Sequence, residues 1–142
     1  MLSGFALELG LKLFYMTFHE KAARGHDLTG LYEGLPDQIR GDISESYSAS
    51  LEASTLGTIK LYAFRTSPEQ PSVPEEWPPH RYDSATELFK AVSLLFVRAR
   101  YFFEKVGPDD WAIMDHPVEH VLLMSDVLEV VYDEYLRRGS WV

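Results

Sequence analysis

The residues from Ser84 to Val106 constrain the fold of this chain more than any other stretch. Apolar side chains recur along them at the spacing of one helical face, at Leu88, Val92, Leu95, Ala99, Phe102 and Val106. A second, largely aromatic stripe runs beside the first. A helix that is apolar over so much of its circumference is buried between neighbours rather than laid on a surface. The stretch therefore predicts a long helix at the centre of a packed helical domain.

Both ends of this stretch carry helix boundary signals. Ser84 and Glu87 have the spacing of a capping box, in which the Ser84 hydroxyl accepts from the Glu87 amide and the Glu87 carboxylate reaches back. Gly107 and Pro108 follow directly and stop a helix.

The length, cysteine count and net charge of the chain narrow the class of protein. With 142 residues the chain has the size of one domain, which we expect to span 1–142. It has no cysteine, which excludes disulfides, thiolate chemistry and a cysteine-based zinc site. Its net charge of −9 makes direct nucleic-acid binding unfavourable. We expect no cofactor and no metal.

The first residues are apolar enough to resemble a signal or membrane segment. Glu8 and Lys12 interrupt the run, and it lacks a basic start and a cleavage site of small residues. We therefore expect a helix of a cytoplasmic protein over 2–23, with Glu8 and Lys12 paired at the favourable i, i+4 spacing. Gly4 and Gly10 are tolerated there if another helix approaches closely.

Further helices are predicted on either side of the central one. Asp27 is a plausible N-cap of a short helix that Pro36 ends, and a third helix covers 37–53. The last helix runs from Pro117 to Arg138. The segment 55–82 is rich in proline and predicts a long loop, in which 59–64 is either a short strand or a helical turn. Residues 107–115 are a connection. The sum is an all-α bundle of four or five helices.

Two parts of the sequence carry a family resemblance. The first is the apolar helix that ends in Gly25-His26-Asp27-Leu28, followed by a leucine-spaced helix and Leu35-Pro36. The second is the pair Arg100-Tyr101 followed by Phe103-Glu104. In this order they resemble the HEPN superfamily (higher eukaryotes and prokaryotes nucleotide-binding domains). The resemblance implies an α-helical bundle, frequent dimers, and a place in prokaryotic toxin–antitoxin or defence systems.

Many members of that superfamily are ribonucleases that use an arginine and a histidine separated by four to six residues on the late helix. Here the positions after Arg100 hold Lys105, Val106 and Gly107, and those after Arg98 hold no histidine either. The resemblance therefore implies a member without the ribonuclease motif, which works by binding.

Arg100 lies on the aromatic stripe, where an unpaired guanidinium is costly. We expect an ion pair with Glu8 of the first helix or with Glu104 one turn on. The alternative is a ligand- or phosphate-binding role for Arg100, with Arg98 nearby, because arginine suits bidentate phosphate contacts.

The histidines suggest two further sites. His26 and Asp27 are either an acid–base pair or, as we prefer, capping and loop residues. His116 and His120 match the H-x-x-E-H spacing of inverted zinc peptidases. Pro117 would place His116 at the non-helical cap, so we interpret this match as coincidence and predict no metal site.

Two classes of function follow. The first is a binding or regulatory module that we expect to form a homodimer and to act on a protein partner. The second is an enzyme acting on RNA or nucleotide, with Arg100 and a non-standard second residue such as Glu104 or Lys105. A lesser alternative is an acidic mimic of nucleic acid made by a mobile element.

Overall fold

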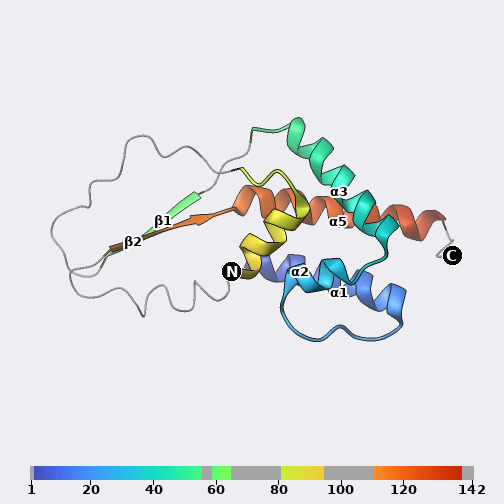
Figure 1. Ribbon diagram of the computed structural model, residues 1–142. Coiled ribbons are helices and arrows are strands. Elements are labelled where there is room, and N and C mark those ends of the chain that lie inside the picture. Colours follow the sequence, from blue (N-terminus) through green and yellow to red (C-terminus); the bar gives the residue numbers. More distant parts are fainter. Residues whose placement is uncertain (1, 56–58, 65–80, 95–110, 139–142) are drawn as a thin grey trace.

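A computed structural model describes residues 2–55, 59–64, 81–94 and 111–138. Within them lie five helical segments and two strands. The helices are α1 (Leu2–His19), α2 (Leu28–Glu33), α3 (Asp37–Glu52) and α5 (Val118–Arg138). A further helical segment covers 85–94 and is drawn in yellow in Figure 1. The strands are β1 (Ile59–Phe64) and β2 (Trp111–His116). The predicted helical bundle is confirmed.

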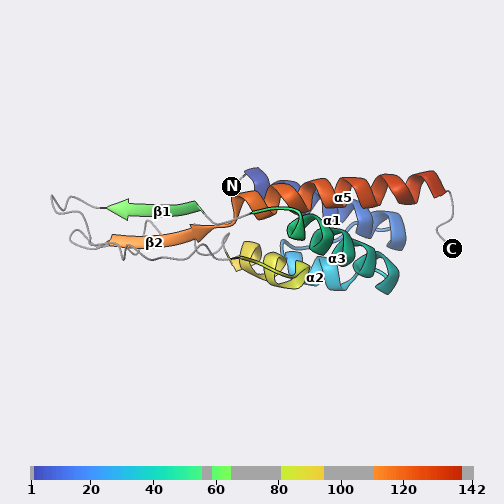
Figure 2. The same cartoon turned by 90° about the horizontal axis from the view of Figure 1, so that it is seen from above.

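The bundle is built around α1 and α5, which lie side by side in both views (Figures 1 and 2). They run parallel, because Gly10 faces Leu128 and Phe14 faces Tyr132 further along both helices. Helix α3 packs on α5, and α2 packs on α1. The closeness of α1 and α5 depends on Gly10, where an added Cβ would lie 3.1 Å from the Leu128 side chain.

The core takes one side of each helix at the predicted spacing. The buried stripe of α3 consists of Ile39, Ile43, Tyr47 and Leu51. The buried stripe of α5 includes Val121, Met124, Leu128, Val131 and Tyr135. The fully enclosed side chains include Leu7, Leu11, Phe14, Leu28, Ile39, Ile43, Tyr47, Leu88, Phe89, Val121 and Met124. The segment 85–94 begins with the predicted cap, since the Ser84 hydroxyl accepts from the Glu87 amide at 3.1 Å. The rest of the predicted long helix, 95–106, lies outside the described residues.

Helix α1 ends four residues before the predicted Ala23. Glu20 follows it with a φ of 53°, a left-handed conformation that stops a helix. No large apolar side chain follows Phe18 before Leu28. His19 instead donates from Nε2 to the carbonyl of Gly34 at 2.7 Å, which ties the end of α1 to the end of α2.

The two strands form an antiparallel ribbon beyond the end of the bundle at which α5 begins (Figure 2). Ile59 lies opposite His116, and Phe64 lies opposite Trp111. The strand alternative at 59–64 is thus the one found, while the prediction of a plain connection over 107–115 is wrong for its last residues. Both runs contain β-formers, Ile59, Tyr62 and Phe64 in β1 and Trp111 and Ile113 in β2. No local pattern predicts their pairing, because the two strands lie far apart in the sequence.

The chain re-enters the bundle at Arg81 and Tyr82, where three hydrogen bonds hold it. Arg81 donates to the Leu51 carbonyl at 2.6 Å, and the Tyr47 hydroxyl donates to the Tyr82 carbonyl at 2.6 Å. The Tyr82 amide donates to Nε2 of His120 at 3.3 Å. The Tyr82 side chain packs against the core.

Candidate functional site

Helix α1 leaves one of its two apolar stripes uncovered. Phe5, Leu9, Leu13 and Met16 are 51%, 52%, 41% and 51% exposed, while Leu7 and Leu11 on the other stripe are fully buried. The four side chains follow each other at intervals of four, four and three residues and so form one continuous ridge. A contiguous apolar ridge of this kind marks an interaction surface more often than scattered exposed residues do.

A shallow groove lies beside this ridge, between α1 and α5. It is lined by Ala6, Gly10, Leu13, Phe14, Ser125, Leu128, Glu129, Tyr132 and Asp133. Its volume of about 210 Å³ is below the roughly 300–1,000 Å³ of typical small-molecule sites. The groove therefore suits one or two inserted side chains better than a cofactor.

The α5 side of the groove carries two acidic side chains, and an exposed leucine lies on α5 on either side of them. Glu129 and Asp133 are exposed, and neither takes part in an ion pair with any residue that the structure describes. Leu122 and Leu136 are 55% and 53% exposed and stand seven residues before and after Glu129, on the same side of α5. We call the α1 ridge, the groove and these two leucines the α1–α5 face.

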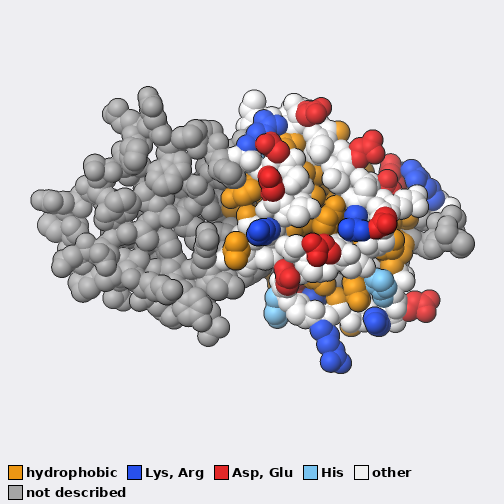
Figure 3. Space-filling view, in the orientation of Figure 1, with side chains coloured by type: hydrophobic (Ala, Val, Ile, Leu, Met, Phe, Trp, Pro, Cys, Tyr) orange, Lys and Arg blue, Asp and Glu red, His pale blue; other side chains and the backbone are white. Residues whose placement is uncertain are grey.

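The side of the bundle opposite the α1–α5 face has a different distribution of charged and apolar side chains. Figure 3 looks onto α3 and the segment 85–94, with α1 and α5 behind them. Acidic and basic side chains there interrupt the apolar patches.

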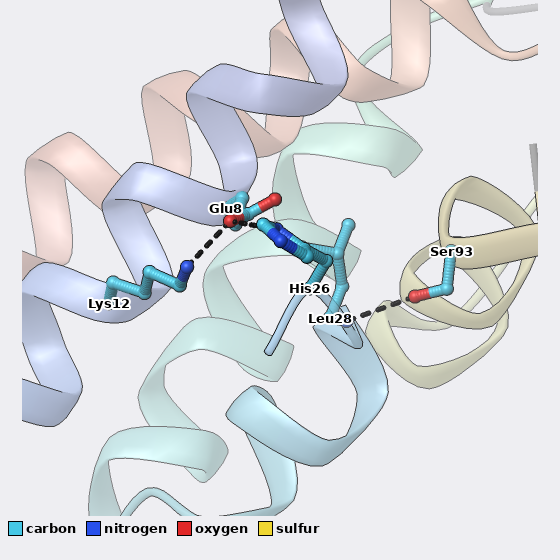
Figure 4. A network of polar contacts seen from close by, with 5 residues as sticks. All are labelled: Glu8, Lys12, His26, Leu28 and Ser93. Atoms are coloured by element: carbon cyan, nitrogen blue, oxygen red, sulfur yellow. Dashed lines mark hydrogen bonds and ion pairs between the residues drawn. The ribbon is translucent and has the colours of Figure 1, made fainter. Parts of the chain in front are cut away.

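A buried carboxylate organises the polar contacts at the start of α2 (Figure 4). The Glu8 side chain is 5% exposed and accepts from Lys12 Nζ at 2.7 Å and from His26 Nδ1 at 2.8 Å. Burial alone would raise the pKa of Glu8, but the hydrogen bonds and positive charges of Lys12 and His26 outweigh it and hold that pKa below its ordinary value. The predicted Glu8–Lys12 pair is confirmed, whereas the contact of His26 with Glu8 was not predicted.

Asp27 and Ser93 extend this network to the next helix. Asp27 is the N-cap of α2 and accepts from the Thr29 amide at 3.1 Å, the capping role that the sequence predicted. The Ser93 hydroxyl accepts from the Leu28 amide at 3.0 Å and lies 3.4 Å from the Asp27 carboxylate.

A carboxylate bonded to an imidazole is also an arrangement used in acid–base catalysis. His26 is 81% exposed, however, and it does not line the groove between α1 and α5. The pair therefore has the geometry of an anchor that holds the α1–α2 loop on α1.

Of the remaining residues predicted for a site, some are described by the structure and others are not. His120 is fully buried, and its Nε2 is used by the Tyr82 amide, so this nitrogen is not available to a metal. No group of three or more potential metal ligands occurs among the described residues. Arg98, Arg100 and Glu104 lie outside them, so the roles predicted for these three residues, including a Glu8–Arg100 pair, stay predictions.

The Glu8 network yields a pH-dependent prediction. Because the folded-state pKa of Glu8 is lowered, its contribution to stability is present above the unfolded value of about 4.3 and is lost as the pH falls through the folded value. We expect Glu8→Gln to lower the free energy of unfolding by about 1–2 kcal/mol at pH 7. The difference should shrink as the pH falls through the folded-state pKa of Glu8, because wild-type Glu8 then becomes protonated itself.

Urea unfolding over a series of decreasing pH values measures this effect. Glu45→Gln, an exposed carboxylate on α3, is the matched control and should change stability little across the series. A loss for Glu8→Gln that stays the same across the whole series would contradict the role of Glu8.

No protein-family model, curated protein or solved structure matches this chain. Among the described residues, no helix combines the length and the apolar character needed to cross a membrane.

Proposed function

We propose that this chain is a protein-binding module: a HEPN-like, non-nucleolytic regulatory domain of a prokaryotic toxin–antitoxin, defence or mobile-element system, acting in the cytoplasm through the α1–α5 face. The family part of the proposal is supported by the sequence resemblance and by the helical bundle. The binding part is supported by the surface itself.

The observation that carries the proposal is the exposed ridge of α1. Leu9 and Leu13 stand at its middle, half exposed, on a helix whose other stripe is fully used by the core. Fully burying a large aliphatic side chain contributes about 1.5–3 kcal/mol, so a partner that covers one of these half-exposed side chains gains roughly half of that. The ridge and the groove beside it offer several such side chains in one place, which is the pattern of an interface centre.

Leu9→Asp tests this proposal, and Val130→Asp is its control. The two side chains are 52% and 54% exposed, but Val130 lies on another side of α5, away from the groove. We expect both variants to fold. We expect only Leu9→Asp to weaken binding, by at least about tenfold, because it places a carboxylate in the apolar centre of the contact.

Light scattering after size exclusion provides the readout, with the protein alone and after incubation with host lysate, each with and without nuclease treatment. A partner complex that Val130→Asp retains and Leu9→Asp loses supports the module. Equal behaviour of the two variants, or a particle that carries nucleic acid and is lost on nuclease treatment, contradicts it.

A homodimer is the form of binding predicted from the sequence, and the same measurement on the protein alone tests it. A dimer mass that falls to a monomer mass in Leu9→Asp would mean that a second copy covers the α1–α5 face.

A further inference from the structure

We propose that the α1–α5 face binds one amphipathic helix of a partner protein, with lysine or arginine on the flank that meets Glu129 and Asp133. This inference rests on the proposed protein-binding function and adds the chemistry of the partner. It is carried by the shape of the face and by the distribution of charge around it.

The shape of the face matches a helix. From Phe5 to Met16 the ridge is about 16 Å long at 1.5 Å per residue, which is three helical turns. The α5 side has the same direction, because α1 and α5 run parallel. A helix laid along them would place its own apolar residues at i, i+3 or i+4, i+7 and i+11 against the ridge and the groove.

The charges on the two sides of the face are unequal. On the α5 side, Glu129 and Asp133 line the groove and are exposed. On the α1 side, the charge of Lys12 is already matched by Glu8 at 2.7 Å. A partner helix therefore meets net negative charge on one flank, and basic residues there gain electrostatic complementarity.

A second copy of this chain is a poorer match. Helix α1 contains one lysine, Lys12, and no arginine, and the lysine is bonded within its own helix. A two-fold contact of this face would place the carboxylates Glu129 and Asp133 of both copies in one interface. The net charge of −9 on each copy adds to that repulsion.

The experiment uses two synthetic peptides of about 18 residues, long enough to cover the ridge. Both carry leucines at i, i+3, i+7 and i+11; one has lysine along a single flank, and the other has glutamate at those same positions. Fluorescence anisotropy of the labelled peptides with the full chain measures their dissociation constants. We expect the basic peptide to bind about tenfold or more tightly than the acidic one, and less tightly as salt is raised.

The double variant Glu129→Lys, Asp133→Lys should reverse this preference, while Val130→Lys, a charge change outside the face, should leave it unchanged. Equal binding of both peptides, no binding of the basic one, or a preference that the double variant leaves intact would overturn the inference. So would a dimer in solution that Leu9→Asp dissociates, because the second copy would then be the occupant.

The two proposals fail in distinguishable ways. If Leu9→Asp loses the natural partner and Val130→Asp keeps it, but the peptides show no charge preference, only the basic-helix inference is wrong. If Leu9→Asp and Val130→Asp bind the partner alike, the α1–α5 face is not the binding surface at all.

Discussion

Tyr47→Ala is expected to lower the free energy of unfolding by about 3–5 kcal/mol. Tyr47 is among the largest fully buried side chains, and it sits in the middle of the α3 stripe. Its removal leaves a cavity that the packed helices can close only in part. Since domains of this size are stable by about 5–15 kcal/mol, such a loss leaves the protein marginal. Urea or thermal unfolding followed by circular dichroism measures the effect.

Tyr47→Phe separates the contribution of the hydroxyl group to stability from that of the ring. The hydroxyl donates to the Tyr82 carbonyl at 2.6 Å, so its loss alone should cost about 1–2 kcal/mol. Burial, and then the nearby charge of Asp83, raise the pKa of the Tyr47 phenol. The folded state thus holds this proton above pH 10, where the unfolded chain releases it, and wild-type stability should fall more steeply in alkali than that of Tyr47→Phe. Equal losses for Tyr47→Ala and Tyr47→Phe would contradict this account.

Phe14→Ala is expected to cost about 3–5 kcal/mol as well, through the contact between α1 and α5. The Phe14 ring is 1% exposed and meets the Tyr132 ring edge-on, with 5.1 Å between their centres. Leu13→Ala is the matched control on the same helix, since Leu13 is 41% exposed and should cost less than about 1 kcal/mol. Chemical denaturation of both variants measures the difference, and similar losses would mean that α1 is not fixed on α5 through Phe14.

Much of the fold was predictable because its helices follow simple periodicity. Ile39, Ile43, Tyr47 and Leu51 recur every fourth residue and are buried as expected. Local signals also fixed the caps at Asp27 and Ser84, since a short polar side chain and the amides it satisfies lie within three residues.

Other features depend on contacts that no local pattern records. Both stripes of α1 are apolar, so the sequence alone did not tell which one α5 covers and which one stays exposed. The strand at 111–116 exists because it pairs with 59–64, far back along the chain. His19 at the end of α1 bonds to the carbonyl of Gly34, the C-cap of α2, which no pattern within α1 predicts.

In the candidate site, too, the contacts within one helix were predictable and the contacts between distant segments were not. Glu8 and Lys12 are neighbours on one helix, and the sequence predicted their pair correctly. His26 reaches Glu8 only through the path of the α1–α2 loop. The α1–α5 face combines residues from the first and the last described helices, and no sequence pattern shows that these two helices lie side by side.

The parallel pairing of α1 with α5 has a consequence for synthesis on the ribosome. Helix α1 is made first, whereas its main packing partner is made more than a hundred residues later. At 5–20 residues per second this delay is on the order of 10 s. Throughout it, Leu7, Leu11 and Phe14 have no α5 to cover them, and the Phe5–Met16 ridge is apolar as well. The nascent chain therefore presents a helix that is apolar on two sides, and chaperones that bind such segments have several seconds in which to do so.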